Sequence, residues 1–199
     1  MDNYVITISR QFGSLGRSIA QKLAEKLEID FLDRDIVEET AKRMGQPISV
    51  ISDEEENAKS VFFRRKYPLG TVIGSFADDI FSVQKNIILD VASKESCIIV
   101  GRCADSILRE HPNHLNVYIY APYEKRLENC TKTLLMDEKT AKRMIKEVDM
   151  ARSNYQRKYC PEVNSIFDHK DIMIDSSRFG VEGTADILAD IVRKRWGKQ

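Results

Sequence analysis

The stretch ISRQFGSLGRSIAQKLAEKL, residues 8–27, decides the fold, because it predicts a strand end, a glycine-containing turn and an amphipathic helix in succession. A phosphate-binding loop has the pattern G-x-x-x-x-G-K-[S/T]. Gly16 and Ser18 stand at the second glycine and the hydroxyl positions of that pattern, whereas Gln11 replaces the first glycine and Arg17 the lysine. The segment is therefore either a phosphate loop that uses an arginine or an ordinary strand–helix turn.

The chemistry of the substituted positions still suits an anion. A helix that starts at Gly16 presents backbone N–H groups and the positive end of its dipole, and glycine lets the backbone approach a phosphate closely. Arg17 keeps the positive charge, and a guanidinium binds phosphate through two hydrogen bonds. Ser18 is placed either to bind Mg²⁺ or to cap the helix. The candidate anion-binding residues are Arg10, Gly13, Ser14, Gly16, Arg17 and Ser18.

Short apolar segments alternate with helical patterns along the rest of the chain. We expect strands at 4–8, 29–32, 97–100, 115–120 and 171–175. We expect helices at 16–27, 33–44, 76–93, 137–159 and 181–196, and one that starts after 121–122. Strands separated by helices pair in parallel through right-handed crossovers. The sequence therefore predicts a three-layer α/β fold with a five-stranded parallel sheet, formed as one domain by residues 1–199, with excursions near 45–75 and 125–165.

The first excursion contains two segments of unusual composition. Residues 52–58 are acidic, and we interpret them as the solvated start of a helix. Residues 61–75 mix aromatic residues, arginines, proline and glycines, which is typical of a mobile loop or small lid. The aromatic residues Phe62, Phe63 and Tyr67 suit a lid, a dimer contact or the core alike, so the pattern leaves the oligomeric state open.

Composition disfavours two classes of partner. Lys and Arg together number 31, as do Asp and Glu, so the formal charge is zero and nucleic-acid binding is not favoured. No apolar run approaches the roughly 20 residues that a membrane span requires, and the N-terminus has no signal pattern, so we expect a cytoplasmic protein. Cysteines at 97, 103, 130 and 160 form no C-x-x-C pair, which predicts free, mostly buried thiols and not a metal site.

Charged residues recur where the predicted strands end. Asp33 follows the second strand, and Arg102 follows the strand CIIV, at the sheet edge where open α/β folds bind ligands. Arg102 either binds an anion or pairs with a neighbouring acid. Asp149 and Arg152 share one face of a highly charged helix. That helix is either a solvated surface helix or an arginine-bearing lid, and the company of a phosphate loop favours the lid.

With these residues in hand, the chain resembles the cytidylate kinase family, in particular its divergent cytidylate kinase-like branch. The likeness covers most of the chain. It is carried by ISRQFGSLGRSIAQKLAEKL, FLDRDIV, IIVGRCADSIL, YEKRLENC, DMARSNY and DIMIDSSRFGVEGTADILADIV. Cys103 stands where the family has an aspartate, and Ile145 stands where a lid arginine is expected. The middle segment, where the family grips cytosine, does not match clearly.

The resemblance implies a P-loop kinase that uses ATP and Mg²⁺ and transfers the γ-phosphoryl group to CMP or dCMP. Carried over by residue, it puts Gly13, Gly16, Arg17 and Ser18 on ATP and Mg²⁺. It puts Asp33 and Arg102 on the acceptor, and Asp149 and Arg152 on the lid. Arg17, Arg102, Asp149 and Arg152 are the catalytic candidates, and Arg143 or Arg157 are candidates to assist Arg152. Two alternatives remain: a P-loop kinase for another small acceptor, and an ATP-binding regulator with a degenerate kinase site.

Overall fold

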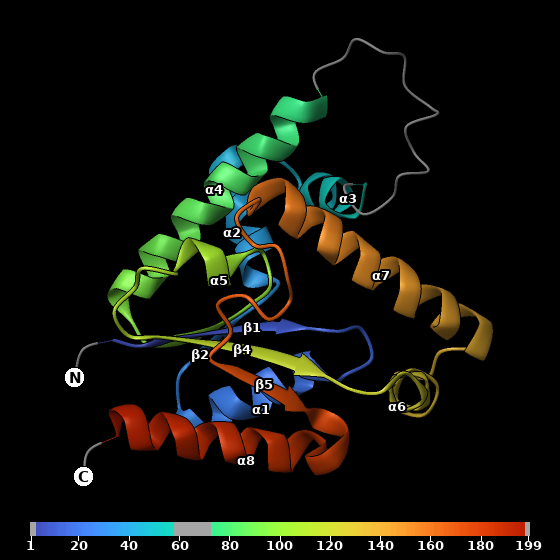
Figure 1. Ribbon diagram of the computed structural model, residues 1–199. Coiled ribbons are helices and arrows are strands. Elements are labelled where there is room, and N and C mark those ends of the chain that lie inside the picture. Colours follow the sequence, from blue (N-terminus) through green and yellow to red (C-terminus); the bar gives the residue numbers. More distant parts are fainter. Residues whose placement is uncertain (1–2, 58–72, 198–199) are drawn as a thin grey trace.

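A five-stranded, fully parallel sheet forms the centre of the computed structural model, which describes residues 3–57 and 73–197 (Figure 1). Its strands are β1 (Val5–Arg10), β2 (Asp30–Leu32), β3 (Cys97–Val100), β4 (His114–Tyr120) and β5 (Ile172–Asp175). Their order in the sheet is β2-β3-β1-β4-β5. The central β1 pairs with β3 on one side and β4 on the other, and its residues Val5, Ile6 and Ile8 are fully buried. The predicted parallel sheet is confirmed.

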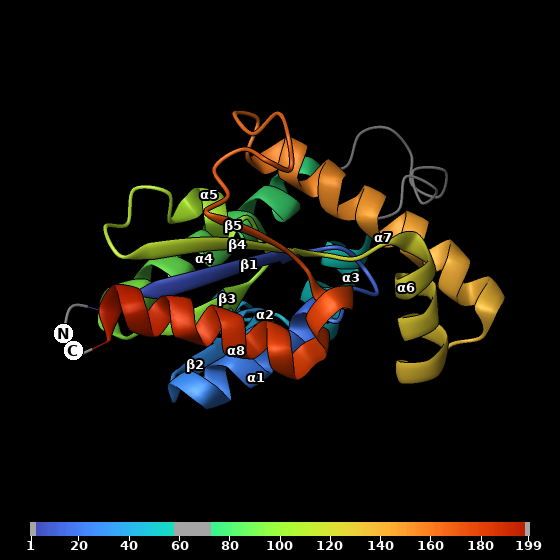
Figure 2. The same cartoon turned by 60° about the horizontal axis from the view of Figure 1, so that its bottom comes forward.

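Helices cover both faces of the sheet. They are α1 (Gly16–Leu27), α2 (Asp35–Met44), α3 (Ile48–Asn57), α4 (Ile73–Lys94), α5 (Ala104–Ile107), α6 (Tyr123–Glu128), α7 (Glu138–Tyr159) and α8 (Ser176–Trp196), with a π-helical turn, η2 (Asn129–Thr133), after α6. Figure 1 shows α1 and α8 below the sheet and α4 and α5 above it, which is the predicted three-layer arrangement. Both views place α6 and α7 beyond the carboxyl ends of the strands (Figure 2).

Each face of the sheet has its own apolar cluster. The apolar stripe of α1, with Ile19 and Leu23, packs with Leu188 of α8 against Ile8 and Val117 of the sheet. On the opposite face, Ile87 and Ile88 of α4 pack against the remaining side chains of β1 and β3. The helical spacing that the sequence shows in α1 is therefore the spacing that buries one of its sides.

The bounds of most expected elements shift by one to three residues in the structure, and α4, expected at 76–93, spans Ile73–Lys94. β1 continues to Arg10, because Ser9 and Arg10 stay in register with β4. The acidic run lies in the second half of α3 and does not start it, since that helix begins directly after Pro47, which is favoured at helix starts. α8 begins at Ser176, where the Asp175 carboxylate accepts the Ser177 N–H and caps the first turn. The non-helical backbone of Gly180, at φ 66°, divides α8, and the helix predicted at 181–196 is the segment that follows this kink.

The segment 61–75, the cysteines and the hydropathy of the helices are the subject of further expectations. The predicted lid or loop at 61–75 lies mostly outside the described residues. All four cysteines are free and buried, as predicted. No helix in the described ranges combines the length and hydropathy that crossing a bilayer requires.

Candidate functional site

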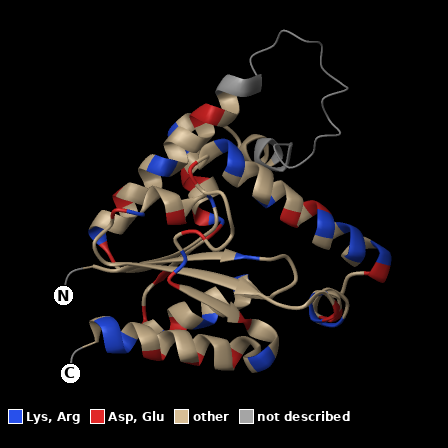
Figure 3. Ribbon diagram, in the orientation of Figure 1, with Lys and Arg blue, Asp and Glu red and all other residues tan. Residues whose placement is uncertain are grey.

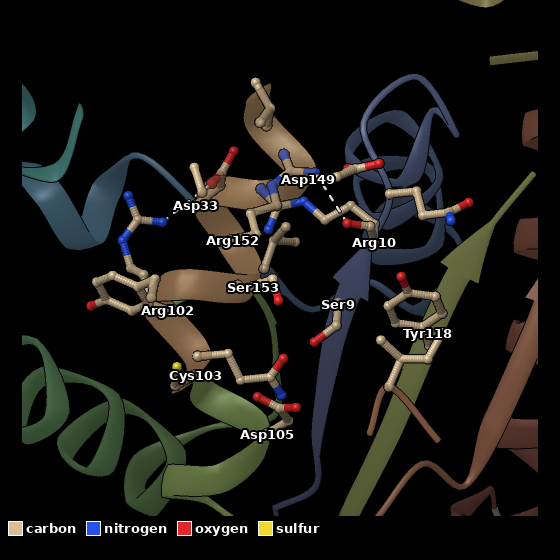
Figure 4. A pocket seen from close by; sticks show the side chains of 18 residues that line it. Ser9, Arg10, Asp33, Arg102, Cys103, Asp105, Tyr118, Asp149, Arg152 and Ser153 are labelled. Atoms are coloured by element: carbon tan, nitrogen blue, oxygen red, sulfur yellow. Dashed lines mark hydrogen bonds and ion pairs between the residues drawn. The ribbon is translucent and has the colours of Figure 1, made fainter. Parts of the chain in front are cut away.

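A cavity of about 430 Å³ lies between the carboxyl ends of the strands and α7 (Figure 4). Its walls come from the ends of β1 and β3, from the residue that follows β2, from Tyr118 of β4, and from one side of α7. Five of the candidate residues line it: Arg10, Asp33, Arg102, Asp149 and Arg152. The fold therefore gathers side chains that the sequence separates by more than a hundred positions, at the edge of the sheet where α/β proteins bind ligands.

Arg10 occupies a crowded place at the end of β1. A Cβ atom on Gly101 would lie 2.5 Å from Nη1 of Arg10, so the glycine makes room for this guanidinium. Within the described part of the chain no hydrogen bond or ion pair engages that guanidinium. Burial, together with the neighbouring charges of Arg152 and Arg102, lowers the pKa of Arg10 to about 9. Arg10 is still charged at neutral pH, and an anion in the cavity would supply the partner it lacks.

Asp33 connects two other arginines of the site. Its Oδ2 atom lies 2.6 Å from Nε of Arg17, and its Oδ1 atom accepts a hydrogen bond of 3.4 Å from Arg102. The Asp33 side chain is 11% exposed, whereas that of Arg17 is 59% exposed. Asp33 thus holds the start of α1 and the end of β3 in one network. The predicted pairing of Arg102 with an acid is confirmed, and its predicted binding of an anion stays a prediction.

Asp149 and Arg152, one turn apart on α7, hold the backbone on either side of Gln11. The Phe12 N–H donates to Oδ1 of Asp149 at 2.7 Å, and Arg152 donates to the carbonyl of Arg10 at 3.0 Å. Burial lowers the pKa of Arg152, and the Asp149 carboxylate opposes that change. The charged helix is therefore docked on the loop, and Figure 3 shows the Lys and Arg residues along it. Its role as a lid stays a prediction.

The loop itself turns at Gly13 rather than at the first position of the pattern. Gly13 has φ +79°, and a Cβ atom there would lie 2.8 Å from the Arg126 carbonyl. Gln11 has no positive φ, and its side chain accepts the N–H of Ala121 at 3.1 Å, so glycine is not required at that position. Leu15, at φ 57°, precedes α1. The loop therefore reaches a helix start without the first glycine of the usual pattern.

The remaining loop candidates lie outside the lining of the cavity. Ser14 is fully buried, and its hydroxyl donates to the carbonyls of Gln11 and Ile119. Gly16 and Ser18 belong to the first turn of α1, and Ser18 is exposed. The N–H groups of that first turn have no intrahelical acceptor. The site thus has two adjoining parts: a helix start outside and an arginine-lined cavity inside.

A model of the cytidylate kinase-like family matches residues 5–178. The chain belongs to this family. Family membership makes it a kinase whose substrates are nucleotides or other small molecules. No curated protein sequence matches the chain.

Solved structures share the fold of this cytidylate kinase-like protein. An uncharacterized protein from Eubacterium ventriosum is 27% identical, with a TM-score of 0.72 over 97% of this chain and 100% of that chain. The shikimate kinase from Acinetobacter baumannii, solved with shikimate, is 14% identical, with a TM-score of 0.54 over 98% of this chain and 96% of that one. A gluconokinase from Sinorhizobium meliloti is 14% identical, with a TM-score of 0.51 over 98% of each chain. The fold is that of the P-loop kinases.

The cytidylate kinase-like chain departs from its family pattern at Cys103 and Ile145, and the structure places both. Cys103 is 7% exposed, lines the cavity and packs in one cluster with Cys160. Ile145 is 3% exposed and packs with Cys130 of η2. At both positions a buried, uncharged side chain therefore stands where the resemblance implies a charged one.

Sequence reasoning missed Arg126, which lies on α6. Its Nη1 atom lies 2.5 Å from Oδ2 of Asp149, and its side chain is 11% exposed. An arginine among the charged residues of YEKRLENC gives no sign of a partner 23 positions away. By contrast, Arg143 and Arg157, the candidates to assist Arg152, are exposed and outside the lining of the cavity.

Proposed function

We propose that this protein is a nucleoside monophosphate kinase that transfers the γ-phosphoryl group of ATP to CMP or dCMP. The observation that carries the proposal is the position of Arg10, Arg102 and Arg152 around one cavity. The start of α1 adjoins this cavity, because Arg17 pairs with Asp33 in the cavity wall. Phosphoryl transfer requires two anionic groups to meet, and cations that surround the meeting point lower the barrier. The cytidylate kinase-like family supplies the pairing of ATP with a cytidine nucleotide.

In this proposal the helix start holds ATP. Backbone N–H groups between Gly13 and Ser18 face the phosphates, since the positive φ of Gly13 and the first turn of α1 leave donors there. Arg17 adds charge at the same end, and Arg10 lies where loop and cavity meet. Ser18, which is exposed in the first turn, is the proposed Mg²⁺ ligand.

Magnesium in such sites is held mainly by nucleotide phosphates, with one or two protein oxygens. Within the described residues there is no cluster of three or more His, Cys, Asp or Glu side chains able to hold a metal. A site that shares the ion with ATP fits this arrangement. The ion would neutralise charge on the phosphates during transfer.

The cavity holds the acceptor. Arg102 and Arg10 contact its phosphate, and Asp33 orients Arg102 through the bond of 3.4 Å. Arg152 lines the cavity from α7 beside Arg10, and it stabilises the charge that develops on the moving phosphoryl group. No protein nucleophile is needed, because positioning and electrostatics supply the catalysis.

A different small acceptor is the second candidate. Cys103 replaces the aspartate of the family pattern in the wall of the cavity, which removes a hydrogen-bond acceptor that a base would meet. The related folds include kinases named for shikimate and for gluconate, which shows that this architecture serves acceptors other than nucleotides.

The experiment is an assay of ADP formation with ATP and Mg²⁺ against CMP, dCMP, UMP, AMP, GMP, shikimate, gluconate and no acceptor. Turnover with CMP or dCMP well above the others supports the proposal. Turnover with another acceptor moves the assignment to the second candidate. ATP binding without turnover on any acceptor of the panel contradicts the cytidylate assignment and favours a regulator with a degenerate site.

A further inference from the structure

We propose that Arg126 is a positioning residue of the phosphate loop, which it fixes in place through Asp149. This role lies outside the phosphate-loop pattern, since it depends on contacts between α6, α7 and the loop. Its consequence for ATP binding rests on the function proposed above, whereas its consequence for the loop does not.

Three polar contacts enclose the peptide groups of one loop residue. Arg126 Nη1 donates to the carbonyl of Phe12 at 3.2 Å and to Oδ2 of Asp149 at 2.5 Å. The other oxygen of Asp149 accepts the N–H of Phe12 at 2.7 Å. Both backbone groups of Phe12 are therefore held by one ion pair, and the Arg126 side chain is only 11% exposed.

Neighbouring contacts make the same surface of α6 and η2 the support for the loop. Asn129 donates to the carbonyl of Gly13 at 2.8 Å. The Gly13 position is so close to Arg126 that a Cβ atom would lie 2.8 Å from the Arg126 carbonyl and 3.1 Å from its Cβ atom. The loop backbone is thus packed on α6 and leaves no space for a side chain at Gly13.

The Arg126–Asp149 pair joins α6, α7 and the loop because its arginine comes from α6 and not from α7. On α7, position 145 carries an isoleucine that packs with Cys130 and Ala141, so α7 presents no arginine from that position to Asp149. The guanidinium comes from α6 instead. As a result, Arg126 influences two features at once. It fixes the position of α7 through Asp149, and it fixes the conformation of the loop through the Phe12 carbonyl.

Energetics argue for a role beyond stability. A largely buried ion pair contributes little net stability, because desolvation offsets the attraction between its charges. In addition, Nε of Arg126 is buried and has no hydrogen-bond partner among the described residues, which adds a further cost. An arginine held at that cost fits a requirement for fixed loop geometry, since a loop already in its binding conformation loses less entropy when an anion binds.

The contact between Asp149 and Phe12 supports the loop and does not take part in binding phosphate. Phe12 is the second residue of the eight-residue pattern, and the donors at the start of α1 come after it. Asp149 therefore does not occupy the helix start. It holds the loop from the side of α7 and leaves the N–H groups of the first turn available.

The experiment compares Arg126→Gln, Arg126→Lys, Asp149→Asn and the double variant Arg126→Gln/Asp149→Asn with the full wild-type chain. Lys125→Gln is the matched control, because Lys125 precedes Arg126 on α6 and pairs with Glu128 at the surface. Two quantities are measured: hydrogen–deuterium exchange of the loop peptide without nucleotide, and the Kd of a non-hydrolysable ATP analogue by titration calorimetry.

We expect Arg126→Gln to speed exchange at the loop and to weaken binding of the analogue about tenfold. Arg126→Lys should restore part of both effects, and Lys125→Gln should change neither. The double variant should be no worse than either single variant, since the two residues act as one unit.

Unchanged loop exchange in a folded Arg126→Gln protein would overturn the inference, as would effects of the two single substitutions that simply add. A wild-type chain that fails to bind the analogue would overturn the proposed function instead, and the exchange measurement would still decide the role of Arg126. Faster exchange throughout the chain, and not in the loop alone, would show a purely structural role and would also overturn it.

Discussion

Arg17 and Asp33 form an ion pair of 2.6 Å between Nε of the arginine and Oδ2 of the aspartate. The pair joins the start of α1 to the end of β2, and Arg102 extends it to the end of β3. An arginine suits this position because its Nε can hold a carboxylate while its two terminal nitrogens remain available for another anion. The Asp33 side chain therefore links the start of α1 to the cavity.

Replacement of Asp33 by asparagine tests this link. The amide keeps the shape of the carboxylate but loses the charge that orients Arg17 and Arg102, so we expect kcat/KM to fall about tenfold or more. The free energy of unfolding should change by less than about 1 kcal/mol, because the partner Arg17 is 59% exposed and the amide oxygen of asparagine can still accept the hydrogen bond from Arg102. Kinetics and thermal unfolding of Asp33→Asn measure both. Asp30→Asn, which alters an exposed carboxylate on β2, is the control. A Tm that falls in step with activity would contradict the prediction.

Removal of the Arg10 charge should separate activity from stability. Its lowered pKa means that the folded protein disfavours the charged form, so that below pH about 9 the charge opposes folding. Arg10→Met should therefore keep or raise Tm and raise the acceptor KM about tenfold or more, through loss of a charge-assisted contact. Arg143→Met removes an exposed arginine of α7 and should change neither. A large loss of Tm in Arg10→Met would show that the guanidinium supports the fold instead.

Added phosphate supplies a test of Arg10 that needs no turnover. An anion that binds the folded state alone stabilises it by mass action. We expect millimolar inorganic phosphate or CMP to raise the Tm of the wild type, and the rise to shrink in Arg10→Met. Equal rises in both proteins would place the anion away from Arg10.

Gly101 and Gly45 form a matched pair for the space around Arg10. Both have positive φ, +80° and +62°, but a Cβ atom would lie 2.5 Å from Arg10 only at position 101, and position 45 is open. Each alanine should therefore cost about 1–2 kcal/mol of stability from backbone strain. Only Gly101→Ala should also raise the acceptor KM, because it displaces the guanidinium. Steady-state kinetics measure the KM, and thermal unfolding measures the stability of both variants. Equal KM values in the two variants would contradict the idea that Gly101 makes room for the Arg10 guanidinium.

The sheet and its helices are predictable from the sequence because their signals are local. Apolar β-branched runs such as CIIV match β3 without error, and the stripe of Ile19 and Leu23 matches the buried side of α1. The end of β1 is harder to predict, since Arg10 extends the strand only by pairing with β4. Such pairing depends on residues about a hundred positions away.

The site is predictable only in part for the same reason. Asp33, Arg102, Asp149 and Arg152 follow from positions at strand ends and on one helix face, and they do line one cavity. The partner of Asp149 does not follow, because Arg126 meets it through the angle between α6 and α7 and not through spacing. Tertiary contacts of that kind leave no periodic signal in the chain.

Arg17→Lys restores the residue of the usual loop pattern and is the sharpest test of the pair described first. A lysine has one ammonium group, so it can serve the Asp33 carboxylate or a phosphate but not both in the fork geometry of Arg17. If the loop is adapted to arginine, kcat/KM should fall about tenfold, and Asp33→Asn should then cost little more in the lysine background. If the loop is degenerate, the lysine should raise the rate instead, most of all together with Gln11→Gly. Steady-state kinetics of these variants and the wild type with ATP and the best acceptor, with thermal unfolding as the control for folding, distinguish an adapted loop from a decayed one.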